Sequence, residues 1–157
     1  MNKFQKILNW IPQLLDGAKI TILLTVCAVC AGLLLGIVLA LGSMSKNKIL
    51  RGISKAYVFF FRGTPLLMQL YFVYYGLPEI SRALTINNKF LAAFIAFGLN
   101  SGAYCSEIFR AAIQSIDKGQ MEAGKVLGLS YLQTMRLIIL PQSIRRLIPP
   151  VGNEFIM

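Results

Sequence analysis

The sequence predicts an all-α membrane protein, a helical bundle with three transmembrane helices and a cytoplasmic helical hairpin. Of its 157 residues, 56% are hydrophobic and 14% are charged, and the mean hydropathy is +0.64. A soluble domain has about 45–50% apolar and about 25% charged residues. The apolar residues also fall into three long runs, and most basic residues lie between them. This pattern indicates membrane-crossing helices joined by basic segments that face water.

The charge and the cysteine content argue against several other classes of protein. Sixteen Lys and Arg against six Asp and Glu give a net charge of +10, which in a soluble chain would favour a nucleic-acid partner. Here the basic residues flank apolar runs, so we expect contact with anionic membrane lipid and no nucleic acid. Cys27 and Cys30 lie inside an apolar run and the chain has no His, so we expect no metal site and no cofactor.

Residues 1–19 are expected to form an interfacial segment at the N-terminus. Apolar residues recur there at helical spacing, and Trp10 suits the level of the lipid headgroups. The pattern predicts a short amphipathic helix on the membrane surface, with Pro12 as a candidate break. Asp16-Gly17 is expected to turn the chain into the bilayer.

The first span is predicted over residues 20–41. These 22 residues carry no charge, and at about 1.5 Å per residue they cross a hydrocarbon core of about 30 Å. Gly32 and Gly36 indicate either the close approach of another helix or ordinary glycine usage in a membrane helix. The segment 43–57 follows, and its basic residues without any acid predict a cytoplasmic loop, with Lys46, Lys48, Arg51 and Lys55.

The second span is predicted over residues 56–77 and contains polar groups. Arg62 at the centre of a membrane helix costs about 2.5–3.5 kcal/mol on insertion scales, so the fold must compensate it. Either its side chain reaches the cytoplasmic headgroups, or it faces a polar interior or an acid on another helix. Pro65 removes a backbone hydrogen bond and predicts a kink, where the Thr64 hydroxyl can satisfy a freed carbonyl. Gln69 is a further candidate for a buried polar group.

The third span is predicted over residues 90–109. Asn100 lies in its middle and Glu107 near its inner end, where an acid is a functional candidate by default. Glu107 pairs either with Arg110 at helical spacing on the same helix or with Arg62 on span two. Three crossings place the N-terminus outside and the following segment in the cytoplasm.

That following segment, residues 117–141, is predicted to fold as a hairpin of two short helices. Asp117 can cap the first helix with Gln120 at its third position, and Gly128 stands where a left-handed C-terminal cap is needed. Ser130 and a glutamine three residues later repeat the N-terminal signal for the second helix. We expect Pro141 to interrupt that second helix.

The residues of the hairpin resemble a known signature. Their order is similar to the EAA loop, the cytoplasmic element of membrane subunits of ATP-binding-cassette (ABC) importers, and the matching residues are Glu122-Ala123-Gly124, Gly128, Ile138 and Leu140-Pro141. The family has Ala where this chain has Gly124. A glycine inside a helix costs about 0.8–1 kcal/mol relative to alanine, so it is expected to loosen the first helix. In this family the loop docks into a groove on the ATPase subunit.

Segments 59–78 and 99–124, and more weakly 14–25, resemble the polar amino-acid branch of these permeases (histidine, glutamine, arginine and opine type). The resemblance implies a type I ABC importer permease fold in the bacterial inner membrane. It also implies uptake of polar amino acids delivered by an extracytoplasmic binding protein. The pore would be shared with a second permease subunit, identical or not, and ATP would be hydrolysed by separate ATPase subunits, so this chain is not expected to be an enzyme.

The resemblance gives the candidate site residues two roles. We expect six of them to couple the chain to the ATPase: Glu122, Ala123, Gly124, Gly128, Ser130 and Pro141. We expect five others to line the translocation pathway: Arg62, Thr64, Gln69, Asn100 and Glu107.

The end of the chain differs from the family pattern, which has two further spans after the EAA loop. Residues 147–157 match the start of the next span, so we expect a permease domain that is incomplete at its C-terminus. The alternative function is then a truncated membrane subunit that cannot transport and acts only in binding or assembly.

Overall fold

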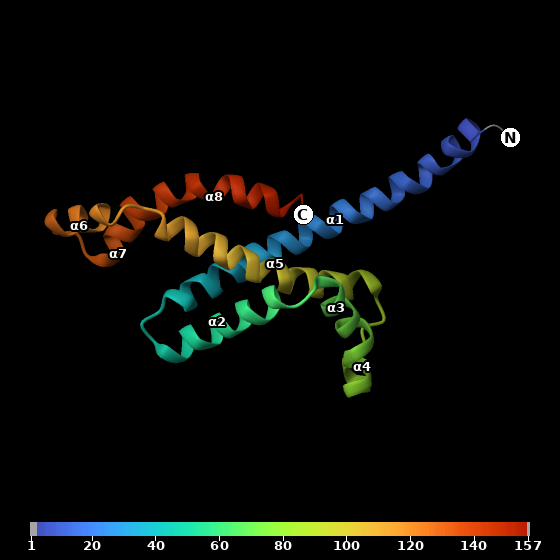
Figure 1. Ribbon diagram of the computed structural model, residues 1–157, viewed down its shortest axis with the longest axis horizontal. Helices are drawn as coiled ribbons and strands as arrows, with labels where there is room; N and C mark the ends of the chain where they lie inside the picture. The colour runs from blue at the N-terminus through green and yellow to red at the C-terminus, as the bar shows by residue number, and fades with distance from the viewer. Residues whose placement is uncertain (1–2, 157) are drawn as a thin grey trace.

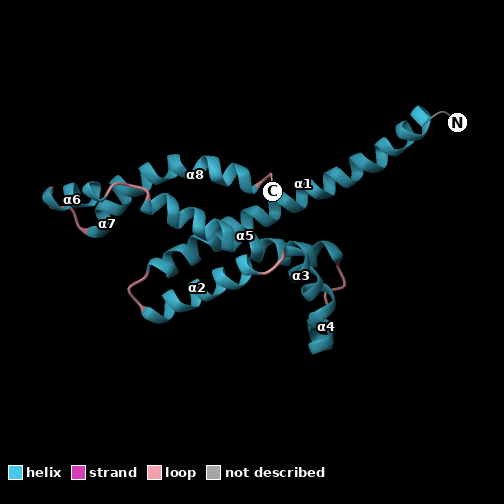
Figure 2. Cartoon of the chain, in the orientation of Figure 1, coloured by secondary structure: helices cyan, strands magenta, loops and turns pink. Residues whose placement is uncertain are grey.

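The computed structural model describes residues 3–156, which form helices and short connections without a strand (Figure 2). In Figure 1, α2 lies next to the crossing of α1 and α5, α8 returns along α5, and α6 and α7 form a separate tip. The helices are α1 (Lys3–Met44), α2 (Lys48–Gly63), α3 (Leu66–Tyr71), α4 (Leu77–Ile80), α5 (Lys89–Gln114), α6 (Lys118–Val126), α7 (Tyr131–Thr134) and α8 (Leu140–Glu154), with π turns at Phe72–Gly76 and Met135–Ile139 and a 3-10 turn at Arg82–Leu84.

Helix α1 is one continuous helix, so the predicted break and turn near the N-terminus were wrong. It passes through Pro12 and through Asp16-Gly17 without interruption. Local side-chain bonds stabilise the helix at the expected turn, because Lys19 Nζ pairs with Asp16 Oδ1 at 3.0 Å and the Thr21 hydroxyl donates to Gly17 O at 3.0 Å. Within the described residues, one helix is long and apolar enough to cross a membrane, Trp10–Met44, with a mean hydropathy of 2.9 in its 18-residue apolar window. The predicted first span lies inside it.

Small residues hold α1 against α5. A Cβ on Gly36 would lie 2.6 Å from Cys105 Cβ, and one on Gly32 would lie 2.7 Å from Ser101 Cβ. Both glycines therefore serve the close approach of two helices, which was one of the two interpretations of their spacing. Most residues buried in this pair are also small, including Ala28, Ala40, Ala103, Cys105 and Ser106.

The basic segment after α1 is mostly helical, in contrast to the predicted loop. Helix α2 begins at Lys48 because the Asn47 side chain accepts hydrogen bonds from the backbone N–H groups of Ile49 and Leu50. Arg51 and Lys55 consequently lie on a helix, and only three residues connect α1 to α2.

The second predicted span is broken, not kinked. Helix α2 ends at Gly63, and Thr64 and Pro65 are extended, with ψ angles of 142° and 133°, before α3 begins. A proline disfavours the helical conformation of the residue before it, so the pair Thr64-Pro65 separates the two helices.

The hairpin continues into α8 without the predicted interruption at Pro141. The π turn Met135–Ile139 joins α7 to α8, and Pro141 lies in the first turn of α8, where its missing N–H costs least. Residues 147–157 were expected to begin another span. Those up to Glu154 lie in α8, which packs along α5, and the further span stays a prediction.

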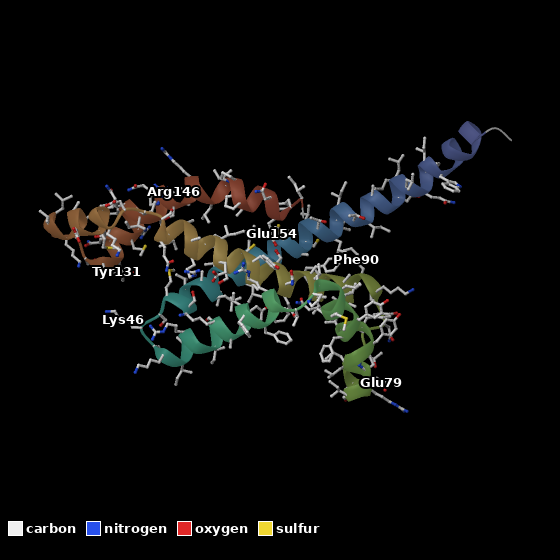
Figure 3. The ribbon with its side chains drawn as sticks, in the orientation of Figure 1. Lys46, Glu79, Phe90, Tyr131, Arg146 and Glu154 are labelled. Atoms are coloured by element: carbon white, nitrogen blue, oxygen red, sulfur yellow. The ribbon has the colours of Figure 1, made fainter. Side chains whose placement is uncertain are left out.

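The two ends of the molecule carry different elements. Lys46, in the turn between α1 and α2, and Tyr131, in the hairpin, lie toward the same end, whereas Glu79 on α4 lies toward the opposite end (Figure 3). The basic turn and the hairpin therefore lie toward the same end of the molecule although they are far apart in sequence.

We expect the substitution Gly36→Ala to lower the free energy of unfolding by about 1–3 kcal/mol, because the added methyl group has no room beside Cys105. The measurement is unfolding of the purified protein by SDS in mixed micelles, followed by circular dichroism. Gly17→Ala is the matched control in the same helix, where an added Cβ meets nothing within 4 Å. Equal losses of stability in the two variants would contradict the packing assigned to Gly36.

Candidate functional site

A central cavity of about 730 Å³ lies where the break between α2 and α3 faces α1, α5 and α8. Its wall combines apolar surface with several polar groups and one charged residue of each sign. Such a mixture is typical of sites for small polar molecules. The polar and charged lining residues are Thr21, Thr25, Arg62, Thr64, Asn100, Ser101, Tyr104 and Glu154.

Side-chain amides satisfy the carbonyl groups that the helix break leaves free. Pro65 has no N–H to offer Phe61 O, and this oxygen instead accepts from Gln69 Nε2 at 2.9 Å and from Asn100 Nδ2 at 3.2 Å. The Thr64 hydroxyl donates to Phe60 O at 2.9 Å and not to the carbonyl that Pro65 leaves free, in contrast to the role expected from the sequence. A polar network therefore stabilises the break.

Gln69 and Asn100 connect the break to α5. Asn100 Nδ2 donates to Gln69 Oε1 at 3.0 Å, and Gln69 Nε2 donates to Thr64 Oγ1 at 2.8 Å. Gln69 is 7% exposed and does not line the cavity. Its amide positions the wall of the cavity, whereas Asn100 and Thr64 themselves face the cavity.

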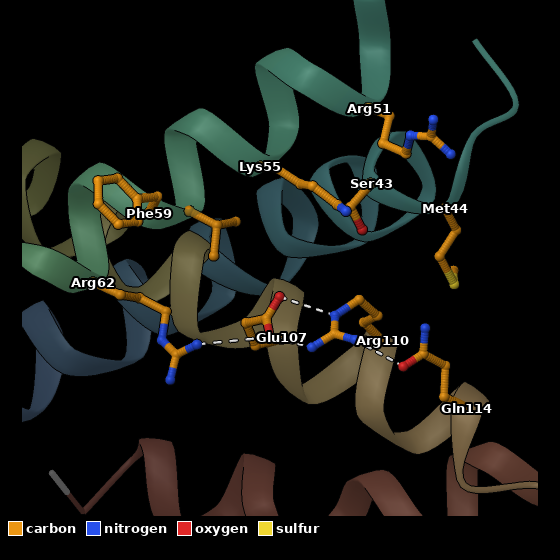
Figure 4. A pocket seen from close by; sticks show the side chains of 10 residues that line it. Ser43, Met44, Arg51, Lys55, Phe59, Arg62, Glu107, Arg110 and Gln114 are labelled. Atoms are coloured by element: carbon orange, nitrogen blue, oxygen red, sulfur yellow. Dashed lines mark hydrogen bonds and ion pairs between the residues drawn. The ribbon is translucent and has the colours of Figure 1, made fainter. Parts of the chain in front are cut away.

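Glu107 contacts both arginines that the sequence offered as partners (Figure 4). Its carboxylate accepts from Arg110 Nε at 3.0 Å and from Arg110 Nη2 at 2.5 Å, and its Oε2 lies 3.7 Å from Arg62 Nη1. The Arg62 guanidinium also lies over the Tyr104 ring, 5.2 Å from its centre. An acid and an aromatic face on α5 thus offset the cost that an arginine would have in the predicted second span. Glu107 does not line the central cavity.

Five polar or charged lining residues were missed in the sequence: Thr21, Thr25, Ser101, Tyr104 and Glu154. Glu154 lies at the end of α8 that reaches α1 and α5 (Figure 3). In the sequence, Glu154 could have been noticed only as a lone acid in a mostly apolar stretch. Its position at the cavity depends on α8 folding back along α5. Ser101 and Tyr104 share the α5 surface of Asn100 at helical spacing.

The tip of the hairpin has the predicted caps. Gly128 has φ of 77°, and the N–H groups of Gly128 and Leu129 donate to Lys125 O and Gly124 O, each at 3.0 Å, as in a Schellman cap. Ser130 and Gln133 form a reciprocal capping box.

The start of α6 has a simpler cap than the sequence suggested. The Asp117 side chain accepts from Gly119 N at 2.6 Å. The Gln120 side chain instead accepts from Gln142 Nε2 at 3.1 Å, which ties α6 to α8.

Gly124 does not simply loosen α6, in contrast to the expectation from helix propensity. A Cβ at this position would lie 2.5 Å from two atoms of the Thr134 side chain, which is fully buried. Gly124 therefore lets α6 and α7 approach closely. Beyond this contact the tip exposes Glu122, Ala123 and a group of large apolar side chains, Val126, Leu127, Tyr131 and Leu132. Exposed apolar surface of this kind favours a protein partner.

Comparison with known proteins assigns the family. Residues 32–157 match the family described as binding-protein-dependent transport system inner membrane component. The chain belongs to this family. Relatives within it include a probable amino-acid permease protein YxeN of Bacillus subtilis, which is 42% identical over 145 residues and covers 92% of this chain and 65% of the relative. The arginine transport system permease protein ArgU of Corynebacterium glutamicum is 43% identical, and the match covers 92% of this chain and 49% of that protein.

A solved structure of this permease family has the same fold. A crystal structure of an amino acid ABC transporter with histidines is 39% identical, has a TM-score of 0.92, and covers 99% of this chain and 72% of that chain. The inward-facing methionine transporter MetNI, at 19% identity and a TM-score of 0.74, shares the fold alone. The permease fold implied by the EAA motif, and the amino-acid branch implied by segments 59–78 and 99–124, are thereby confirmed. The chain spans about half to two thirds of the length of the curated relatives described above.

The substitution Gly124→Ala is expected to lower the stability of the hairpin by about 1–2 kcal/mol, although alanine is the better helix former by about 1 kcal/mol. The reason is the clash with Thr134. The double substitution Gly124→Ala with Thr134→Ala, which removes the clashing atoms, should recover part of the loss relative to the sum of the single variants. Hydrogen exchange of the hairpin amides measures this effect, and a stabilising Gly124→Ala would refute the contact.

Proposed function

We propose that the chain is a permease subunit of an ABC importer and forms part of the translocation pathway for polar amino acids. The observation that carries this proposal is the central cavity with Arg62 and Glu154 in its wall, within a fold that also occurs in an amino acid ABC transporter. The names of the relatives, which include amino-acid, arginine and glutamine permeases, support the substrate class. They do not favour a role restricted to binding or assembly.

The cavity suits an amino acid because its wall carries both signs of charge. A free amino acid has a carboxylate and an ammonium group, and it leaves water only where other groups replace its hydrogen bonds. Arg62 would attract the carboxylate and Glu154 the ammonium, with Thr64, Asn100 and Tyr104 supplying neutral hydrogen bonds. Broken helices that face a central cavity are the usual construction of such sites in transporters.

The membrane arrangement follows the positive-inside tendency. We propose crossings over residues 20–41, 56–77 and 90–109, with the N-terminus outside and the hairpin in the cytoplasm. The family is an inner membrane component, and the basic turn near Lys46 lies toward the same end as the hairpin (Figure 3). Both features support a cytoplasmic location for that end.

The hairpin would couple the cavity to ATP hydrolysis on a separate ATPase subunit. Its exposed apolar tip would dock on that subunit, with the exposed Glu122 and Ala123 beside it. From the hairpin, an unbroken helical path of α7, the π turn and α8 leads to Glu154 at the cavity. Movement of the hairpin would thus be carried along α8 to the cavity wall. The helices would then have two packings, which differ in how well the ATPase subunit binds ATP and the cavity binds substrate. A second permease subunit and an extracytoplasmic amino-acid-binding protein would complete the importer.

In an assembled importer containing this chain, we expect Gly128→Val to reduce the ATPase activity stimulated by the loaded binding protein several-fold. Valine strains a cap with φ of 77° and so displaces the docking tip. Gly128→Asn is the matched control, because asparagine tolerates this conformation. Unchanged stimulation in Gly128→Val would count against the role of the cap.

We expect Glu154→Gln to reduce uptake of a polar amino acid into proteoliposomes by at least about tenfold, since a charge that faces the substrate is lost. Assembly with the ATPase should not change. Glu79→Gln removes the same charge from an exposed position on α4 and is the control. Equal uptake by the two variants would exclude Glu154 from the pathway.

A further inference from the structure

A second cavity lies at the end of the molecule where α1 turns into α2. Its volume is about 610 Å³, and its walls come from the last residues of α1, from α2 and from α5. Figure 4 shows its charged side chains projecting from two helices toward the same space. Four of them are basic, Arg51, Lys55, Arg62 and Arg110, and one is acidic, Glu107.

The single acid does not balance these four bases. Glu107 binds Arg110 through two hydrogen bonds and lies 3.7 Å from Arg62. Arg51 and Lys55 are one helical turn apart on α2, and neither has an acidic partner in the described part of the chain. Like charges at this spacing repel each other. An anion in the cavity would remove this repulsion.

The cavity lies at the level expected for a lipid phosphate. Ser43 and Met44 in its wall directly follow the apolar run that ends at Leu41, so this is where the first predicted span leaves the hydrocarbon core. Beside the basic groups the wall carries the polar residues Ser43 and Gln114 and the apolar residues Val58 and Phe59, of which Phe59 is 82% exposed.

Met44 and Phe59 place apolar surface in the wall beside the bases. A small free anion would gain nothing from this apolar surface, whereas a phospholipid can place its phosphate at the bases and its acyl chains along α2.

We propose that this cavity binds the phosphate group of an anionic phospholipid, with Arg51 and Lys55 as the principal ligands. The lipid phosphate would neutralise the basic side chains on the α2 side of the cavity, while Glu107 remains paired with Arg62 and Arg110. Because Arg62 also lines the central cavity, the bound lipid lies one side chain away from the proposed transport path. The proposal requires a membrane-embedded chain but not that it transports amino acids.

The test is native mass spectrometry of the full 157-residue chain, titrated in detergent with phosphatidylglycerol. The double variant Arg51→Gln with Lys55→Gln should lose about thirtyfold in affinity, at about fivefold for each charge near the lipid surface. The control double variant, Lys46→Gln with Lys48→Gln, loses the same charge at the same end but outside the cavity, and it should bind as the unsubstituted chain does. Circular dichroism checks that both variants are folded.

Competition distinguishes the sources of the phosphate. Phosphatidylethanolamine and free glycerol 3-phosphate should displace phosphatidylglycerol poorly, because the first lacks net charge and the second lacks acyl chains. Equal losses in the two double variants would show general surface attraction and overturn the site. Efficient displacement by glycerol 3-phosphate would overturn the lipid assignment.

A second measurement needs no substitution. A photoreactive phosphatidylglycerol, irradiated with the unsubstituted chain and followed by peptide mapping, should label α2 between Arg51 and Phe59. Labelling spread evenly over the apolar surface would contradict the proposal even if the double variant failed to fold.

Discussion

The close contact between α1 and α5 is the constraint on which the rest of the structure depends. Lipid tails are as apolar as the helix surfaces, so two membrane helices associate through tight packing and not through exclusion of water. Gly32 and Gly36 allow this packing against Ser101 and Cys105. Once α5 is fixed on α1, its remaining faces receive α2 and α8. Asn100 and Glu107, on those faces, then meet the helix break and Arg62.

The polar groups of the interior follow from one backbone defect. Pro65 ends the hydrogen-bond ladder of α2 inside an apolar segment, and free carbonyl groups there are costly. The amides of Gln69 and Asn100 satisfy them and join the break to α5. The same break opens the wall of the central cavity between Arg62 and Leu66. In this fold the element that interrupts the predicted second span is also part of the wall of the central cavity.

Local chemistry could be predicted from the sequence, and tertiary context could not. The caps at Gly128 and Ser130 involve residues within a turn or two, so their spacing determines them. Propensity failed at Pro12, which does not break α1, because a continuous apolar helix outweighs one missing bond. Helix propensity also failed at Gly124, because the close contact with Thr134 determines whether glycine or alanine is the more stable residue there. Glu154 was missed because its place depends on the return of α8.

The central claim is that the hairpin stands on the same side of the membrane as the basic turn between α1 and α2, where it can couple the cavity to an ATPase. Cysteine labelling tests this most directly, with single cysteines at Lys48, Glu79 and Glu122 in a background without native cysteines. A membrane-impermeant maleimide is applied to intact and to permeabilised spheroplasts. The account predicts labelling of the cysteine at position 79 in intact spheroplasts and of those at 48 and 122 only after permeabilisation. Labelling at 122 in intact spheroplasts, with 48 protected, would contradict it.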